Sequence, residues 1–152
     1  MKRTAALLLA LAMLALAGCG GAAKTADLNA VKDALAARFD LSGMMALSED
    51  DLLDMYGVKM DDVKQYAALV AKSSTSADEI LLFEAKDAAA ASRIREKVDG
   101  RYKAKLNEAK DYLPDEYAKI SACKAETSGN FVSLIVSADA EAMVKLYHEA
   151  FK

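Results

Sequence analysis

The chain has 152 residues, of which 54% are hydrophobic and 28% charged, and this composition suits a single ordinary domain with a packed core. Acidic residues (23) outnumber basic residues (20), and the net charge of −3 argues against a nucleic-acid-binding protein. With two cysteines in total, the sequence excludes a small domain held together by several disulfides.

The N-terminal residues resemble a bacterial lipoprotein signal peptide. Two basic residues precede an apolar run from Ala5 to Ala17. The last two residues of this run begin the motif Leu16-Ala17-Gly18-Cys19. The run has about 13 residues, fewer than the roughly 20 that a membrane-spanning helix needs. In lipoproteins of this kind the cysteine thiol receives the lipid after the signal is removed. We therefore expect a signal peptide at residues 1–18 and lipidation of Cys19.

Lipidation would hold the mature protein on the extracytoplasmic face of the cell membrane by acyl chains. After Cys19, the tether in residues 19–26 is small and weakly polar, and it spans at most about 25 Å. A single domain is expected over residues 27–152. Its contact with the membrane is predicted to be the lipid on Cys19.

Two helices are predicted at the start of this domain. Asp27 can cap the first helix, in which apolar residues recur at spacings of three and four until Ser42-Gly43. Ser48 and Asp51 have the spacing of a capping signal, so Glu49–Tyr56 is expected to form the second helix.

Residues 63–72 fit two structures. Their apolar residues have helical spacing, but the polar cluster Ser73-Ser74-Thr75-Ser76 and the apolar run Ile80-Leu81-Leu82-Phe83 follow, as in a β-hairpin. We expect residues 65–72 to pair with 78–85, and a helix over 63–72 is the alternative.

A long amphipathic helix is predicted after Asp87, because apolar residues step by three and four as far as Leu113. Pro114 is expected to end it, since the residue before a proline avoids helical geometry.

A second hairpin is predicted from two apolar segments, 120–125 and 131–137, which flank the turn-forming residues 126–130. Asp139 can then cap a last helix. The element order is αα-ββ-α-ββ-α. This order predicts an α+β fold in which the two hairpins form one antiparallel sheet and the helices pack on one face of it.

Three motifs follow the Cys19 sequence in order: Ala77-Asp78-Glu79-Ile80, Tyr112-Leu113-Pro114-Asp115-Glu116-Tyr117 and Gly129-Asn130-Phe131-Val132. In combination they resemble a family of small lipoproteins from clostridial-type Gram-positive bacteria, catalogued as a domain of unknown function. The resemblance covers most of residues 45–152, with Phe131 where a tyrosine is expected. It implies an extracytoplasmic lipoprotein and brings no activity, cofactor or catalytic residue.

Candidate catalytic and metal-binding residues are few. His148 is the only histidine, and its place near the C-terminus favours an exposed surface residue over a catalytic or zinc-binding one. Cys123 lies in an apolar-polar alternation, which favours a buried, unreactive thiol. The acidic residues of segment 49–62 lack the alternate spacing of a calcium loop, and the methionines lack a repeated spacing suited to copper. We therefore expect no cofactor and no metal site.

The long helix carries an excess of basic residues, and Arg93, Lys97 and Arg101 form a possible partner surface. Its partner would be an envelope protein or an anionic wall polymer, while a solvated helix face is the alternative. The main functional hypothesis is a membrane-tethered, non-enzymatic binding or interaction module. A cell-envelope hydrolase that uses carboxylates is the alternative.

Overall fold

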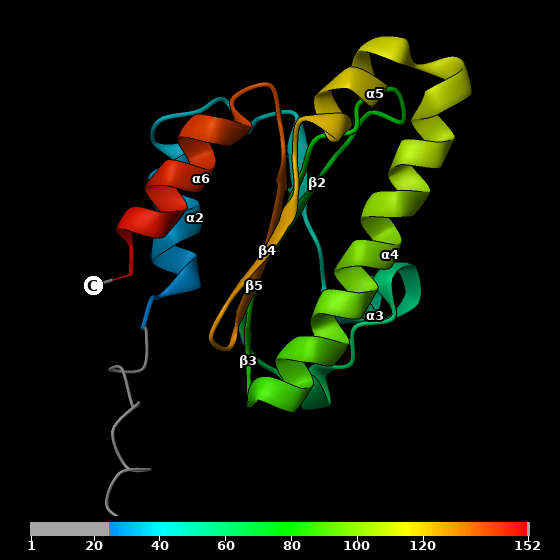
Figure 1. Cartoon of the computed structure of the whole chain (residues 1–152). Coiled ribbons are helices and arrows are strands. Elements are labelled where there is room, and N and C mark those ends of the chain that lie inside the picture. Colours follow the sequence, from blue (N-terminus) through cyan, green and yellow to red (C-terminus); the bar gives the residue numbers. More distant parts are fainter. Residues whose placement is uncertain (1–24, 152) are drawn as a thin grey trace, which may run out of the picture.

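The structure, a computed structural model, describes residues 25–151. The predicted signal peptide and Cys19 lie outside these residues. Five strands form one antiparallel sheet with the order β1-β2-β3-β5-β4 (Figure 1). The strands are β1 (Met44–Ala46), β2 (Val63–Ala71), β3 (Glu79–Ala85), β4 (Ala125–Ser128) and β5 (Phe131–Val136). The expected α+β class and antiparallel sheet are therefore confirmed.

Helices precede, separate and follow the strands. They are α2 (Leu28–Ala36), α3 (Glu49–Tyr56), α4 (Ala88–Tyr112), α5 (Pro114–Ser121) and α6 (Ala140–Glu149), with a short 3-10 turn, η1 (Met60–Asp62), before β2. Among residues 25–151, no helix is both long and apolar enough to cross a membrane.

Residues 63–71 form a strand, so the helical alternative for this segment is wrong. β2 pairs with β3, and Tyr66 lies opposite Phe83 in the ladder. The other edge of β3 pairs with β5, which makes β3 the central strand. The helical spacing in β2 is outweighed by pairing with a strand that is buried along its whole length.

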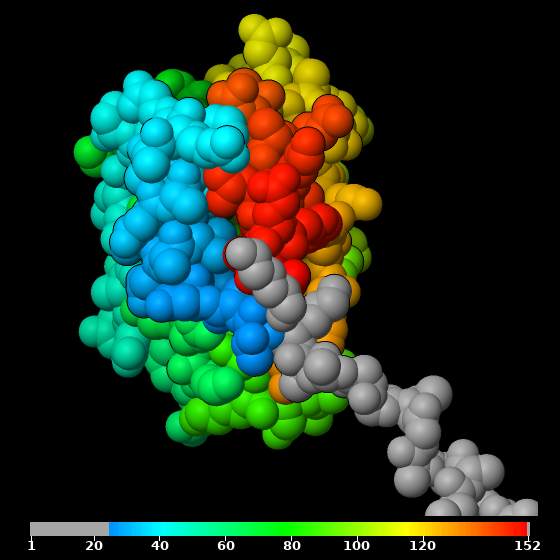
Figure 2. Space-filling model, turned by 90° about the vertical axis from the view of Figure 1, so that its left-hand side faces the viewer, coloured from blue at the N-terminus to red at the C-terminus, as the bar shows by residue number. Residues whose placement is uncertain are grey.

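The helices cover both faces of the sheet, and the expectation that they pack on one face is wrong. On one face, α3, α4 and α5 pack against Leu81 and Phe83. On the other face, α2 and α6 pack against Ile80 and Leu82 and lie side by side in blue and red (Figure 2). Every residue of β3 and β5 is buried, so both faces of these strands need a covering layer.

Local capping chemistry sets most helix starts. The Asp27 carboxylate accepts hydrogen bonds from the first turn of α2, and Ser48 forms a full capping box with Asp51 at α3. The Asp87 carboxylate accepts a 2.7 Å hydrogen bond from Ala90 N at α4. Asp139 occupies the same place before α6 but its side chain makes no capping bond.

Several elements differ from the sequence analysis, and two of them, β1 and α5, are absent from the predicted order. The first helix ends at Ala36 rather than near residue 42. Pro114 ends α4 as expected, but it also starts α5, because proline suits the first position of a helix. Ile120 therefore belongs to α5, and the first strand of the second hairpin is β4 (Ala125–Ser128), where most of the turn was expected, rather than 120–125. Gly129, with a φ of 60°, lies in the tight turn between β4 and β5.

Candidate functional site

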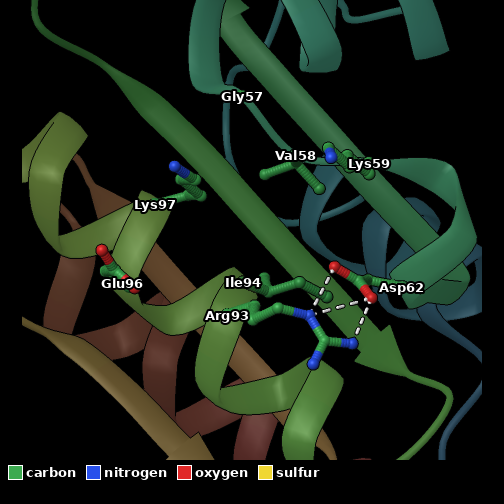
Figure 3. A pocket seen from close by; sticks show the side chains of 8 residues that line it. All are labelled: Gly57, Val58, Lys59, Asp62, Arg93, Ile94, Glu96 and Lys97. Atoms are coloured by element: carbon green, nitrogen blue, oxygen red, sulfur yellow. Dashed lines mark hydrogen bonds and ion pairs between the residues drawn. The ribbon is translucent and has the colours of Figure 1, made fainter.

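Arg93, Lys97 and Arg101, which were predicted to form one partner surface, do not all lie at the same site in the structure. Arg93 and Lys97 line a pocket of about 420 Å³ between α4 and the segment that joins α3 to β2 (Figure 3). Arg101 lies on α4 one turn after Lys97, and it points toward the sheet, where it contacts Glu79. The pocket, which we call the basic groove, is lined by Gly57, Val58, Lys59, Asp62, Arg93, Ile94, Glu96 and Lys97.

The floor of the basic groove is part of the hydrophobic core. Val58 and Ile94 are each 1% exposed and belong to the core between α4 and the sheet. Gly57 ends α3 with a φ of 67°, a left-handed conformation that favours glycine. A Cβ at this position would lie 3.6 Å from Lys97 Cε, so the lysine stem runs close along the glycine backbone.

Charges in the basic groove are unevenly paired. Arg93 Nε donates to both carboxylate oxygens of Asp62, at 3.2 and 3.1 Å, and this hydrogen bonding lowers the pKa of Asp62. Lys59 and Lys97 form no ion pair with any residue between 25 and 151. Two ammonium groups are thus available to an anionic group in the groove. Glu96 at its side likewise forms no ion pair within residues 25–151.

Arg101 belongs instead to a buried ionic cluster of Tyr56, Glu79, Arg101 and Lys105. Glu79 Oε1 accepts a 2.7 Å hydrogen bond from the Tyr56 hydroxyl, and it lies 3.4 Å from Arg101 Nε and 3.6 Å from Lys105 Nζ. Lys105 Nζ also donates to Ala77 O at 2.8 Å. Glu79 is 0% exposed, so no substrate reaches its carboxylate.

The buried ionic cluster ties three elements together, since its members come from α3, β3 and α4. The Arg101 guanidinium lies 5.4 Å from the centre of the Tyr56 ring. Burial raises the pKa of Tyr56 and lowers the pKa of Lys105, because a poorly solvated environment favours the uncharged form of each side chain. The cluster therefore positions α3 and α4, the two helices that border the basic groove.

Sequence reasoning missed this cluster, although one signal pointed to it. Lys105 follows Val98 by seven residues and precedes Ala109 by four, so it occupies the buried stripe of α4. A lysine in a buried stripe needs a partner of opposite charge. Glu79, at the start of the apolar run of β3, is that partner.

The other candidate residues take ordinary places. Cys123 is 8% exposed, its thiol donates to Lys119 O at 3.2 Å, and burial raises its pKa, as a core thiol requires. His148 is exposed, as expected, and its Nε2 lies 2.7 Å from Glu126 Oε2. No group of three or more histidine, cysteine or acidic side chains within residues 25–151 is arranged to hold a metal ion.

Comparison with known proteins gives a family and no activity. No curated protein and no solved structure is significantly similar to the chain. The sequence model of a domain of unknown function, DUF4358, matches residues 37–137, which span both hairpins and α4. This match is with an uncharacterised domain and carries nothing about lipid attachment or bacterial source. Because the match covers more than half of the sequence, the chain belongs to the DUF4358 family.

Proposed function

We propose that this protein is a lipid-anchored, extracytoplasmic binding module whose basic groove binds an anionic wall polymer. The observation that carries the proposal is the pair of ammonium groups on Lys59 and Lys97, which have no ion-pair partner among residues 25–151 and border one pocket. A polymer with repeated phosphate groups suits such a groove, because each repeat presents a new anion to the same two cations.

Anchoring rests on the Leu16-Ala17-Gly18-Cys19 motif and on where the fold begins. Gln65 holds the entering chain: its Nε2 donates to Ala26 O at 2.8 Å, and its Oε1 accepts from Leu28 N at 3.0 Å. Thr25 follows Cys19 by six positions, a length that spans about 20 Å when extended. A lipid on Cys19 would therefore hold the start of the fold within about 20 Å of the membrane surface.

The hydrolase hypothesis has weaker support in the described residues. Glu79, the most deeply buried carboxylate, is closed to solvent and held by Tyr56 and two cations. Asp62 is paired with Arg93. We therefore favour binding over carboxylate catalysis.

Lipid attachment is tested by metabolic labelling with a fatty acid. Wild-type protein should incorporate the label, and Cys19→Ser should not, because the substitution removes the thiol that receives the lipid. Cys123→Ser is the matched control and should label like the wild type, since Cys123 is buried. Equal labelling of wild type and Cys19→Ser would contradict the anchor.

Polymer binding is tested with poly(glycerol phosphate) and the full-length protein in lipid nanodiscs. The Lys59→Gln/Lys97→Gln variant should bind at least tenfold more weakly than the wild type. Lys103→Gln/Lys110→Gln is the matched control, because it removes two exposed positive charges from α4 outside the basic groove. Equal losses in the two variants would show a general charge effect, and wild-type protein that binds no polymer would refute the proposal.

A further inference from the structure

A second pocket lies beside the C-terminal half of α4, where α5 and the connection between β2 and β3 meet this helix (Figure 1). Two contacts hold its walls together. Ala77 N donates to Glu116 Oε2 at 2.6 Å, and Lys119 Nζ lies 2.7 Å from Asp78 Oδ1. These contacts join residues that are 39 and 41 positions apart in the chain, so the pocket is assembled only in the folded domain.

The pocket is small and partly aliphatic. Its volume is about 270 Å³, just below the roughly 300 to 1,000 Å³ of sites for drug-sized ligands. Val70, Ala77, Ala109, Leu113 and Ile120 form the apolar part of the wall. Three of them are buried, while Val70 and Leu113 are half-buried and pack against the core. Such a pocket suits a small ligand with a short aliphatic group.

Two cations of the buried ionic cluster, Arg101 and Lys105, also line this pocket. The ammonium group of Lys105 has three N–H donors. Ala77 O accepts from it at 2.8 Å, and Glu79 Oε1 lies 3.6 Å away. No hydrogen bond or ion pair with residues 25–151 uses the third donor, and the side chain is only 6% exposed. A buried donor without an acceptor is unfavourable, so an acceptor in the pocket would be bound.

A carboxylate borders the pocket next to this ammonium group. Glu108 follows Lys105 by three residues on α4, which places both side chains on one face of the helix. The two form no ion pair, and Glu108 has none with any residue between 25 and 151. Burial lowers the pKa of Lys105, and the carboxylates of Glu79 and Glu108 oppose that change. Glu116, the other acid of the pocket, is held by Lys119 Nζ at 2.8 Å.

These charges select the kind of ligand. A simple anion would meet the Glu108 carboxylate, and a simple cation would meet Arg101 and Lys105. A small molecule that carries a carboxylate and an ammonium group on one carbon can instead satisfy both sides at once. The aliphatic part of the wall would then receive the remaining substituent of that carbon.

We propose that this pocket binds a free aliphatic α-amino acid. The carboxylate of the ligand would accept the third hydrogen bond of Lys105 and lie near the charge of Arg101. The ammonium group of the ligand would donate to Glu108, and the aliphatic side chain would pack on Ala109 and Leu113. This inference rests on the second pocket alone and does not depend on the basic groove or on the anchor.

The test is isothermal titration calorimetry of the full-length protein in lipid nanodiscs with alanine, valine and leucine. We expect at least one of them to bind. The N-acetyl derivative of the best ligand lacks the ammonium group, and its amide lacks the carboxylate. Each derivative should bind at least about tenfold more weakly, because it leaves one charge of the pocket unpaired. Binding of none of the three amino acids, or equal binding of either derivative, would overturn the proposal.

One variant locates the binding. Glu108→Gln changes an exposed position, so the fold should be preserved, and it should weaken amino-acid binding at least about tenfold. It should also abolish the preference for the amino acid over its N-acetyl derivative. Asp111→Asn is the matched control, because it removes an exposed carboxylate of α4 outside the pocket, and it should bind like the wild type. Wild-type affinity in Glu108→Gln would place the binding elsewhere and refute the proposal.

Discussion

Two ionic contacts on the same helix, α4, differ in almost every physical respect. Arg93 pairs with Asp62 at the surface, and its side chain is 56% exposed. Arg101 and Lys105 pair with Glu79, whose side chain is 0% exposed. Exposed ion pairs are screened by water and salt and contribute little, whereas a buried charge that loses its partner is strongly destabilising. The burial of each charged side chain, rather than the excess of basic residues on α4, therefore decides how much that charge contributes to stability.

The largest expected effect on stability is that of a substitution in the buried ionic cluster. Glu79→Gln keeps the size of the side chain but leaves Arg101 and Lys105 without a carboxylate. We expect a loss of about 3 kcal/mol in the free energy of unfolding, measured by urea denaturation. Glu96→Gln removes a carboxylate that forms no ion pair within residues 25–151, and it should change stability by less than about 0.5 kcal/mol. Equal stability of Glu79→Gln and the wild type would show that the buried ionic cluster is not stabilising.

A smaller effect is expected when the charge of Arg101 is reversed. Arg101→Glu places a second carboxylate near Glu79, but the side chain is 22% exposed and can turn toward solvent. We expect a loss of about 2 kcal/mol, read from the same denaturation curves. Lys97→Glu, one turn earlier, should leave the unfolding curve unchanged and weaken binding of poly(glycerol phosphate). A variant Arg101→Glu as stable as Lys97→Glu would remove the distinction between the buried and the exposed charges of α4.

The smallest effect on stability is expected for Arg93→Gln, because the contact with Asp62 is open to solvent. The substitution should instead raise the pKa of Asp62, since the guanidinium is the main cause of its lowering. An NMR pH titration of the Asp62 carboxyl measures this shift. An unchanged pKa would show that Arg93 and Asp62 do not pair in solution.

The sign of the pH dependence follows from this lowering. A carboxyl with a folded-state pKa below its unfolded value of about 3.9 contributes stability above that pH and loses it as pH falls through the folded pKa. The stability of the wild type should therefore decrease more than that of Arg93→Gln as the pH falls below about 3.9. The small difference in stability between the two proteins should be fully present at neutral pH and should vanish once the pH lies below the folded-state pKa of Asp62.

Much of the local structure was predictable from short-range chemistry. The capping box of Ser48 and Asp51, the left-handed Gly57 and the proline after α4 set helix ends through contacts a few residues apart. The hairpin of β2 and β3 followed from the turn-forming residues between two apolar segments. Such features depend on neighbours in the chain, so a single sequence contains the information they need.

The division of the helices between two faces was not predicted, although its cause is visible in the sequence. Ile80-Leu81-Leu82-Phe83 is apolar on both sides of the strand, a pattern typical of a strand covered by two layers. The order of the helices in the sequence does not indicate which of them cover which face of the sheet. That assignment depends on how all the apolar stripes share the available surface, which is a property of the complete packing.

The sequence by itself determined the α+β class, the antiparallel sheet and the place of the long helix between two hairpins, but not β1 or α5. Only the tertiary structure decided that Arg93 and Lys97 border the basic groove while Arg101 turns to Glu79, 22 residues away in the chain. It also brought His148 to Glu126 across a similar separation. Periodicity indicates which side of a helix is buried, but the identity of the buried partner depends on contacts between distant segments. For charged residues that partner decides whether the charge supports the fold or is available for binding.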